Sequence, residues 1–368
     1  METGVYNKND IKLMINHRLI YSDELINVEK QVQPSSFEPR IQGKIYFIGK
    51  SILPRGRSMS QILKDRAQYV VEKDDRIFLD YGKIYIIPLM EKLKLPKGCF
   101  AKASSKSSIG RLGVLTRLIT ENGDLYNHVS EGYEGPLYLE FYSMKFNVVL
   151  KRGISLNQIR FFYNGNGQLA NHELITLLHA GKLYGNSIPD RKDLIKDGGV
   201  LVTCDLKDGV LKAKEGETVD LTIDFDVHGK TNLLKFNDYW SKEFVDKKGE
   251  FTLRLGEFYI IKTKENLIVP LNYAAELRKF EETLGEISVH EAGFVHPGWG
   301  LNRIDNVLGT PLILETTVNK VPFTLGDGDP VAYLNYNKLL SELDEKDADV
   351  KTPHHYQGLN PGKIFIED

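Results

Sequence analysis

The sequence predicts a mainly β protein made of two copies of one domain, and three observations support this. Short runs of β-branched and aromatic residues, cut by Gly and Pro, fill most of the chain after position 76, as in RIFLDYGKIYIIPLMEKLKLP and GPLYLEFY. Few stretches show helical periodicity. The second half of the chain repeats the first. These patterns indicate a sandwich or jelly-roll architecture with a few short helices.

The internal repeat is visible as matches at a nearly constant shift. The segment 78–87 aligns with 252–261 at a shift of 174 residues, and Glu91 continues this match to Glu265. The string GPLYLE aligns with TPLILE at a shift of 175 residues. Chance produces single matches but rarely a long series at one shift, so we interpret the pattern as a tandem duplication of one β domain.

The order of the elements suggests domain boundaries. We expect a first β domain over residues 1–165, a helical linker over 166–199, a second β domain over 200–340 and a C-terminal tail over 341–368.

Three segments have helical signals. Residues 10–15 place apolar side chains on one face, and a serine opens the segment 58–66 as an N-cap. The clearest helix spans 171–180, and we expect Asn171 to cap its start and Gly181 to end it.

Composition limits the function. The 368 residues include 48 basic and 50 acidic side chains, so no overall field attracts nucleic acid or an anionic membrane. The only cysteines, Cys99 and Cys204, are far apart and lie in apolar surroundings, which favours a reducing cytoplasm. No apolar run is long enough to span a bilayer, and the N-terminus has no signal-peptide pattern.

The stretch 101–113, AKASSKSSIGRLG, combines serines, glycines, lysines and an arginine between two strand-like runs. Hydroxyls, backbone N–H groups and a guanidinium are donors that suit phosphate oxygens. A solvated hairpin turn is the alternative for the same composition.

Two glutamates lie in otherwise apolar strands, Glu140 in LYLEFY and Glu315 in LILETT. Such a carboxylate is either a paired structural ion or an acid–base group with an altered pKa. Both occupy the same place in their repeats, and each follows a Gly-rich hairpin, 131–136 or 292–300. Glycines there would allow a flat ligand to approach the backbone closely, although an aromatic-stabilised turn is the other interpretation.

These motifs together resemble a known family. KSSIGRLG, AGFVHPGWG, the strand Leu-Glu pairs and QVQPSSFEPR resemble the dCTP deaminases of the dUTPase superfamily. The two-domain length, with GPLYLEFY and YAAEL, resembles the duplicated bacterial form. The resemblance implies a tandem dUTPase-like distorted jelly-roll, or β-clip, domain.

The resemblance also implies a reaction. It is the hydrolytic deamination of dCTP to dUTP and ammonia, a step toward dTTP, with Glu140 or Glu315 as general base on the attacking water. No zinc is expected, and the H-x-E and P-C-x-x-C signature of the zinc deaminases is absent from the chain. Mg²⁺ would be bound through the triphosphate, and no separate metal site is expected.

The family motifs carry over to named positions. Ser107 and Arg111 are candidates for catalysis as well as for phosphate binding. The full set of expected nucleotide-binding residues is Lys106, Ser107, Ser108, Arg111, Gln158, Ala292, Gly293, His296, Gly298, Trp299, Tyr356 and Gln357.

Neither repeat has the complete set of motifs. The first has VSEGY at the expected base-reading hairpin, and the second has LRKFE in place of the serine–arginine loop and His296 where the family usually has Asp. Because family members are trimers with sites between subunits, we hypothesise a composite site that uses the loop of one repeat and the hairpin and Glu315 of the other. In the alternative, Glu140 is the working base and the second repeat is mainly scaffold.

Other functions stay open. The superfamily also contains dUTP diphosphatases, and a bifunctional enzyme would form dUMP from dCTP directly. A non-catalytic nucleotide-binding regulator is a third possibility. A homo-oligomer, with a trimer favoured, is the expected assembly.

Overall fold

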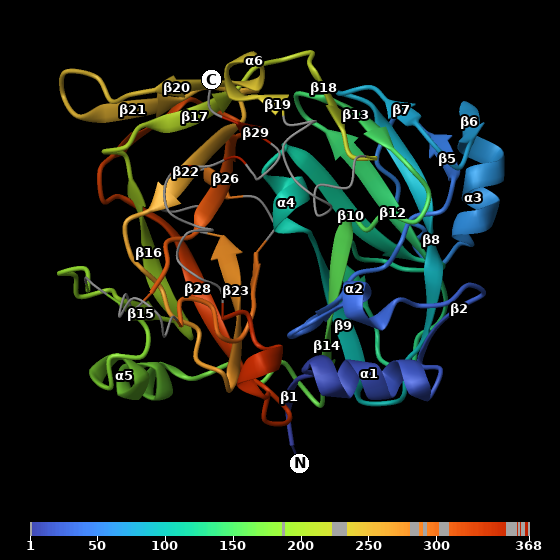
Figure 1. Ribbon diagram of the computed structural model, residues 1–368, viewed down its shortest axis with the longest axis horizontal. Helices are drawn as coiled ribbons and strands as arrows, with labels where there is room; N and C mark the ends of the chain where they lie inside the picture. The colour runs from blue at the N-terminus through green and yellow to red at the C-terminus, as the bar shows by residue number, and fades with distance from the viewer. Residues whose placement is uncertain are drawn as a thin grey trace. The chain divides into compact units, whose positions relative to one another are not determined.

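The computed structural model describes residues 2–185, 188–222, 234–279, 287–289, 293–301, 309–350, 359, 361 and 365–366. The chain divides into two compact units (Figure 1). Unit 1 comprises Met1–Gly165 with Glu215–Leu233, and unit 2 comprises Asn166–Lys214 with Leu234–Asp368. No helix in the described part of the chain is long and apolar enough to cross a membrane.

Unit 1 consists mainly of strands with four short helices among its described residues. The helices are α1 (Lys8–Asn16), α2 (Val28–Gln31), α3 (Met59–Arg66) and α4 (Ser107–Gly110). The strands are β1 (Gly4–Val5), β2 (Ile20–Ser22), β3 (Val32–Gln33), β4 (Ser36–Phe37), β5 (Lys44–Phe47), β6 (Tyr69–Glu72), β7 (Ile77–Leu79), β8 (Ile84–Lys94), β9 (Cys99–Ser105), β10 (Val114–Thr120), β11 (His128–Val129), β12 (Glu134–Ser143), β13 (Asn147–Leu150), β14 (Asn157–Tyr163) and β18 (Thr218–Asp220).

Unit 2 has the same character. Its helical segments are α5 (Asn171–His179), α6 (Phe236–Tyr239) and the 3₁₀ turn η2 (Glu345–Asp347). Its strands are β15 (Ile195–Lys196), β16 (Gly199–Asp205), β17 (Val210–Ala213), β19 (Leu234–Lys235), β20 (Trp240–Glu243), β21 (Glu250–Leu253), β22 (Tyr259–Thr263), β23 (Tyr273–Lys279), β24 (Ile287–Val289), β25 (Phe294–Val295), β26 (Ile313–Val318), β27 (Phe323–Gly326), β28 (Pro330–Lys338) and β29 (Phe365–Ile366).

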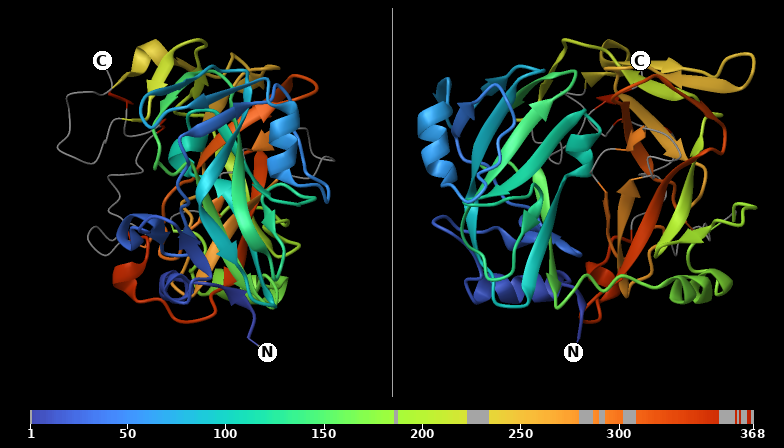
Figure 2. Two further views of the ribbon diagram at one scale, coloured as in Figure 1. Left: turned by 90° about the vertical axis from the view of Figure 1, so that its right-hand side faces the viewer. Right: turned by 180° about the vertical axis from the view of Figure 1, so that it is seen from behind.

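The apolar strands of the first repeat form the main sheets of unit 1. One sheet has the order β11-β9-β14-β4-β3, and another has the order β10-β12-β8-β5-β6. Alternation along β12 turns Leu139 and Phe141 to one face and Tyr138 to the other, where α3 and its preceding loop cover the sheet. Figure 1 and Figure 2 both show α3 beside β5 and β6.

The register of the strands repeats in unit 2. Ile86 of β8 lies opposite Glu140 of β12, and Ile260 of β22 lies opposite Glu315 of β26. The hydroxyl of Tyr85 accepts a hydrogen bond from the backbone N–H five residues earlier at 3.2 Å, and the equivalent Tyr259 does the same at the same distance. The predicted mainly β fold with a tandem duplication is therefore confirmed.

One segment from the second half of the chain belongs to unit 1. Residues 215–222 follow β17 of unit 2 in sequence, yet β18 pairs in parallel with β13 of unit 1. The backbone of Asn147 donates to the carbonyl of Glu217 at 2.8 Å, and Arg76 forms an ion pair with Asp220 at 2.8 Å. The local sequence pattern does not predict that this segment joins unit 1.

The segment expected to be a linker belongs to unit 2. Leu174 of α5, Leu183 and Tyr184 are buried in the core of that unit. The reason is hydrophobic, since one face of α5 and the turn after it are too apolar to stay in water.

The three expected helices are present, with differences at their ends. Helix α3 begins after the N-cap Ser58, as predicted. Helix α1 starts earlier than expected because Asn7 caps it. The predicted N-cap Asn171 is wrong. The cap residue is Ala170, whose N–H donates to the Glu173 carboxylate at 2.9 Å, while the Asn171 side chain accepts from Gly198.

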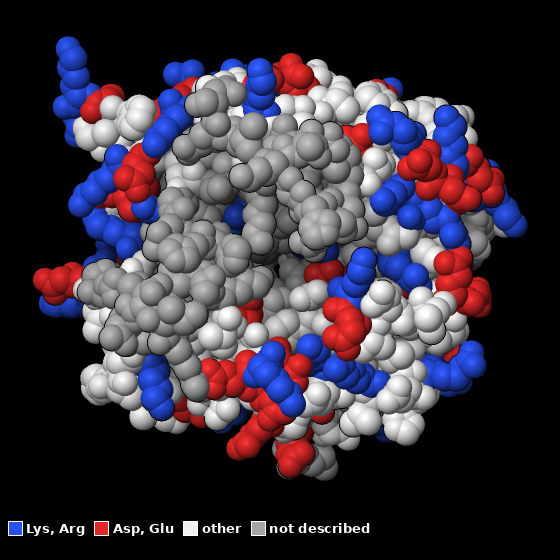
Figure 3. Space-filling model, in the orientation of Figure 1, with Lys and Arg blue, Asp and Glu red and all other residues white. Residues whose placement is uncertain are grey.

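Acidic and basic side chains are interspersed on the described surface in Figure 3. This agrees with the formal net charge of −2. A charged ligand would therefore be held by local groups rather than by a field from the whole protein.

Candidate active site

The serine–arginine loop of unit 1 forms a compact turn between β9 and β10. Ile109 and Leu112 are buried and anchor it, whereas Ser107 and Ser108 are exposed. The backbone N–H of Arg111 donates to the carbonyl of Ser107 at 3.0 Å. The loop therefore presents two hydroxyl groups from a backbone that is already ordered, which lowers the entropy cost of holding a ligand there.

Two other predicted phosphate-binding residues of unit 1 have protein partners. Lys106 forms an ion pair with Glu38 at 2.6 Å. Gln158 is buried on β14, where its amide donates to the carbonyl of Ser105 at 3.3 Å and accepts from Ser36 at 3.1 Å. In this structure Gln158 therefore contacts the end of β9 just before the loop.

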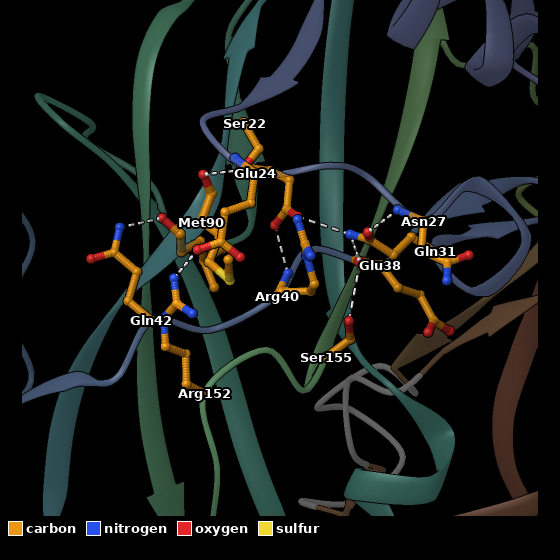
Figure 4. Close-up of polar contacts among 12 residues, drawn as sticks. Ser22, Glu24, Asn27, Gln31, Glu38, Arg40, Gln42, Met90, Arg152 and Ser155 are labelled. Carbon is orange, nitrogen blue, oxygen red and sulfur yellow. Dashed lines mark hydrogen bonds and ion pairs between the residues drawn. The ribbon is translucent and has the colours of Figure 1, made fainter. Parts of the chain in front are cut away.

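The segment QVQPSSFEPR supports the loop from the side. Figure 4 shows Gln31, Glu38 and Arg40 of this segment together with Ser155. The amide of Gln31 and the hydroxyl of Ser155 both donate to the backbone carbonyl of Glu38, each at 3.1 Å. The backbone of Glu38 is thus fixed beside Lys106. Sequence reasoning missed Glu38, although its position in a polar motif with two prolines was a signal.

Glu140 lies in a cluster of polar side chains on β12 and is only 2% exposed. Arg117 is directly opposite on β10, and its Nε donates to Glu140 Oε1 at 2.9 Å. The hydroxyls of Ser51 and Tyr126 donate to the carboxylate at 3.3 and 3.2 Å. Sequence reasoning missed these three partners, because only the strand register identifies Arg117 as the neighbour.

Glu315 occupies the equivalent position on β26 of unit 2 and is also 2% exposed. Its neighbours Leu314 and Val318 face the core of the unit, so alternation places the Glu315 side chain on the opposite face of the sheet. The two glutamates thus share a strand position and burial.

The hairpin of the second repeat forms a tight turn. Trp299 donates its backbone N–H to the carbonyl of His296 at 3.2 Å, with Pro297 and Gly298 at the two central positions. Gly298 has φ +89°, which matches a type II turn. The Trp299 ring packs against the core of unit 2, and its Nε1 lies 3.4 Å from the carbonyl oxygen of Thr310. The turn is therefore anchored to the unit that carries Glu315.

Replacing Gly298 by alanine is expected to destabilise unit 2. The residue has positive φ, and an added Cβ would lie 2.9 Å from the Cβ of Ala348. Backbone strain plus this contact is expected to cost about 1–3 kcal/mol. Gly256→Ala is the matched control, because Gly256 has φ +72° but nothing within 4 Å of an added Cβ. Thermal unfolding should show a larger decrease in Tm for Gly298→Ala, and equal decreases would contradict the packing argument.

The structure places the predicted residues in two sets. Lys106, Ser107, Ser108, Arg111, Glu140 and Gln158 lie in unit 1, whereas Gly293, His296, Gly298, Trp299 and Glu315 lie in unit 2. Ala292, Tyr356 and Gln357 lie outside the described residues. Within the described part of the chain, no group of three or more His, Cys, Asp or Glu side chains is arranged to hold a metal ion.

Comparison with protein families agrees with this division of motifs. The family model for the 2'-deoxycytidine 5'-triphosphate deaminase (DCD) N-terminal domain matches residues 2–166. The model for the C-terminal domain of the same family matches residues 171–365.

Comparison with individual proteins points to the same family. The crystal structure of 2'-deoxycytidine 5'-triphosphate deaminase from Agrobacterium tumefaciens is similar with a TM-score of 0.82 and 32% identity, over 92% of this chain and 100% of that chain. A curated relative from Dictyoglomus turgidum, described as dCTP deaminase, dUMP-forming, is 27% identical over 167 residues, which is 43% of this chain and 79% of the relative. A relative of the same description from Methanosphaera stadtmanae is 28% identical over 163 residues, or 43% and 78%.

Proposed function

Because the chain belongs to the dCTP deaminase family, we propose that it hydrolyses the amino group of the cytosine ring in dCTP, forming dUTP and ammonia. The observation that supports this most is the ordered loop with exposed Ser107 and Ser108 and with Arg111. It lies in a chain that matches a solved dCTP deaminase over nearly its whole length.

Each part of the proposed site has one task. The hydroxyls of Ser107 and Ser108 and the guanidinium of Arg111 would donate to the phosphate oxygens. Lys106 would add positive charge, positioned by Glu38. In the composite-site hypothesis, in which subunits share a site, the backbone of the turn from Gly293 to Trp299 of another subunit would read the edge of the base.

The chemical step needs a general base. A strand glutamate, for which the repeats offer Glu140 and Glu315, would take a proton from the water as its oxygen attacks C4 of cytosine. The same carboxyl group would return this proton to the amino nitrogen, the bond between C4 and that nitrogen would break and ammonia would leave, while the remaining proton of the water moves from the C4 hydroxyl to N3. The product ring then carries a carbonyl at C4, and the atoms of dCTP and water balance those of dUTP and ammonia.

Mg²⁺ is proposed to enter with the nucleotide. Hydroxyls and a guanidinium suit anionic oxygens, so the loop fits a triphosphate whose charge Mg²⁺ partly neutralises. A homotrimer and a cytoplasmic location remain predictions, and the mass of the purified protein in solution tests the first of them.

Product analysis tests the reaction. Purified protein with dCTP and Mg²⁺ is expected to form dUTP, resolved by ion-exchange chromatography, at a rate unchanged by the zinc chelator 1,10-phenanthroline. Loss of activity with the chelator and its recovery with Zn²⁺ would contradict the zinc-independent mechanism. Absence of dCTP turnover, with nucleotide binding intact, would favour a regulator.

A second candidate is direct formation of dUMP from dCTP. It is favoured by the two curated relatives, which are both described as dUMP-forming. The same chromatogram separates the candidates, because dUMP and pyrophosphate would accumulate without free dUTP. A dUTP diphosphatase without deaminase activity would instead consume dUTP and leave dCTP unchanged.

A further inference from the structure

The serine–arginine loop connects strands of two different sheets in unit 1. Strand β9, which precedes the loop, pairs with β11 and β14, whereas β10, which follows it, pairs with β12. Within the described sheets of this unit, β9 and β10 are therefore not joined by a ladder of backbone hydrogen bonds. The spacing of the two ends of the loop must be set by side chains.

Three buried polar side chains join the two sheets at the base of the loop. Ser105 is the last residue of β9, Asn157 lies opposite it on β14, and Thr116 lies on β10 just after the loop. The hydroxyls of Ser105 and Thr116 are 2.9 Å apart and share a hydrogen bond. The amide of Asn157 donates to the Thr116 hydroxyl at 3.0 Å, and the backbone N–H of Thr116 donates to the Ser105 hydroxyl at 3.0 Å. We call these three residues the clamp.

The clamp lies among apolar side chains. Val114 and Leu118 share the face of β10 that carries Thr116, and Ile159 shares the face of β14 that carries Asn157; all three are fully buried. The clamp side chains are themselves 1% exposed or less. Apolar side chains would fill this space without the cost of burying hydroxyl and amide groups. What the polar groups add is a set of directional contacts between the sheets, strengthened by the low dielectric of the interior.

The backbone beside the clamp is fixed to β14 as well. The N–H of Lys106, the first residue of the loop, donates to the carbonyl of Leu156 at 3.2 Å. The amide of Gln158 donates to the carbonyl of Ser105 at 3.3 Å. The start of the loop thus belongs to the sheet of β14, and the clamp is what ties it to β10.

We propose that Thr116 is a positioning residue for the deaminase, which with Ser105 and Asn157 fixes the spacing of β9 and β10 and so holds the donors of the serine–arginine loop where the phosphates of dCTP bind. Thr116 is central because its hydroxyl contacts both of the other side chains. A displacement of about 1 Å in a binding group can cost about 100-fold in rate, so the spacing of the loop ends matters for catalysis. This assignment rests on the proposed deaminase function.

Two substitutions of Thr116 separate its hydroxyl from its shape. Thr116→Val keeps the shape and removes the oxygen, and it is expected to lower kcat/KM for dCTP by about 10- to 100-fold. The loss should be much smaller with deoxycytidine, which has no phosphate for the loop to hold. Thr116→Ser keeps the oxygen and removes a methyl group, and it is expected to retain kcat/KM within a few-fold although its Tm falls.

Thr263→Val is the matched control for the loss of a buried hydroxyl. Thr263 is also 1% exposed, and its hydroxyl accepts from the backbone N–H of Leu312 at 2.8 Å and donates to the carbonyl of Glu265 at 3.1 Å. We expect Thr263→Val to lower Tm as Thr116→Val does, with kcat/KM close to that of the wild type. All rates are measured well below the Tm of each variant.

Hydrogen exchange of the loop gives a readout that does not depend on activity. Amides of residues 106–113, followed by mass spectrometry of the full-length protein, should exchange faster in Thr116→Val and at the wild-type rate in Thr116→Ser and Thr263→Val. The proposal is overturned if Thr116→Val leaves either kcat/KM or this exchange unchanged, or if Thr116→Ser or Thr263→Val loses as much kcat/KM. A wild-type protein that fails to deaminate dCTP would refute the proposed function, and the exchange rates would still show whether the clamp orders the loop.

Discussion

Arg111→Ala is expected to lower kcat/KM for dCTP by about 100- to 1,000-fold, because two charge-assisted hydrogen bonds to phosphate oxygens would be lost. The loop itself should survive, since Ile109 and Leu112 anchor it and the Arg111 backbone bond to Ser107 does not need the side chain. Steady-state kinetics and Tm measured on the same preparation check both parts of this expectation.

The phosphate role makes a sharper prediction for truncated substrates. If Arg111 binds the triphosphate, the variant should lose its preference for dCTP over deoxycytidine, while its low rate with deoxycytidine stays the same. Arg66→Ala is the matched control, because Arg66 is an exposed arginine at the end of α3. An equal loss with both substrates would contradict phosphate binding and place Arg111 in the chemical step or in the scaffold.

Glu91 and Glu265 are buried glutamates at equivalent positions of the two repeats. Replacement by glutamine is expected to lower the stability of the protein at the first position and to raise it at the second. Glu91 is fully buried, and its carboxylate accepts from the backbone and Nε of Arg40, at 2.6 and 2.7 Å, and from the Gln31 amide at 2.9 Å. Glu265 accepts from the backbone N–H of Thr203 at 2.8 Å and from the Thr203 hydroxyl. The first repeat therefore has a cation where the second has a neutral hydroxyl.

Glu91→Gln should destabilise the protein by about 3 kcal/mol, because the Arg40 guanidinium would stay in the interior without a counter-charge. The Arg40 and Gln31 groups that hydrogen-bond to Glu91 are donors, so a glutamine NH₂ group would find no acceptor among them. Chemical denaturation measures this loss. A Glu91→Gln protein as stable as the wild type would contradict the ion-pair argument.

Glu265→Gln should instead stabilise the protein at neutral pH. Burial raises the pKa of the Glu265 carboxyl above its ordinary value of 4.5. A glutamine fits, because its oxygen can accept from the Thr203 N–H while its NH₂ group donates to the hydroxyl oxygen. The gain at neutral pH is about 1.4 kcal/mol for each unit by which the folded pKa exceeds the unfolded one.

The pH dependence gives the sign of the effect. With a raised folded pKa, the contribution of Glu265 to stability is fully present below the unfolded pKa and is lost as pH rises through the folded pKa. The Tm difference between Glu265→Gln and the wild type should therefore be small near pH 4 and grow more positive toward pH 7. A difference that shrinks as pH rises would contradict the raised pKa.

Local sequence patterns were sufficient to predict much of the fold. The repeat at a shift of 174 residues predicted a duplicated β domain, and Tyr85 and Tyr259 make the same hydrogen bond in the two units. Ser58 capped its helix as expected, because a side-chain cap needs only residues within one turn. The serine–arginine loop was likewise visible, since its residues are adjacent in sequence.

The sequence by itself thus determined the fold class, the family and the list of candidate groups, all of which depend on short-range pattern and composition. Only the tertiary structure decided which groups meet. Arg117 neighbours Glu140 through strand register, and Arg40 reaches Glu91 across 51 positions in the chain. The tertiary structure likewise decides that residues 215–222 belong to unit 1. Such contacts depend on which distant segment covers a given face of a sheet, and the free energy of that choice comes from packing rather than from local propensity.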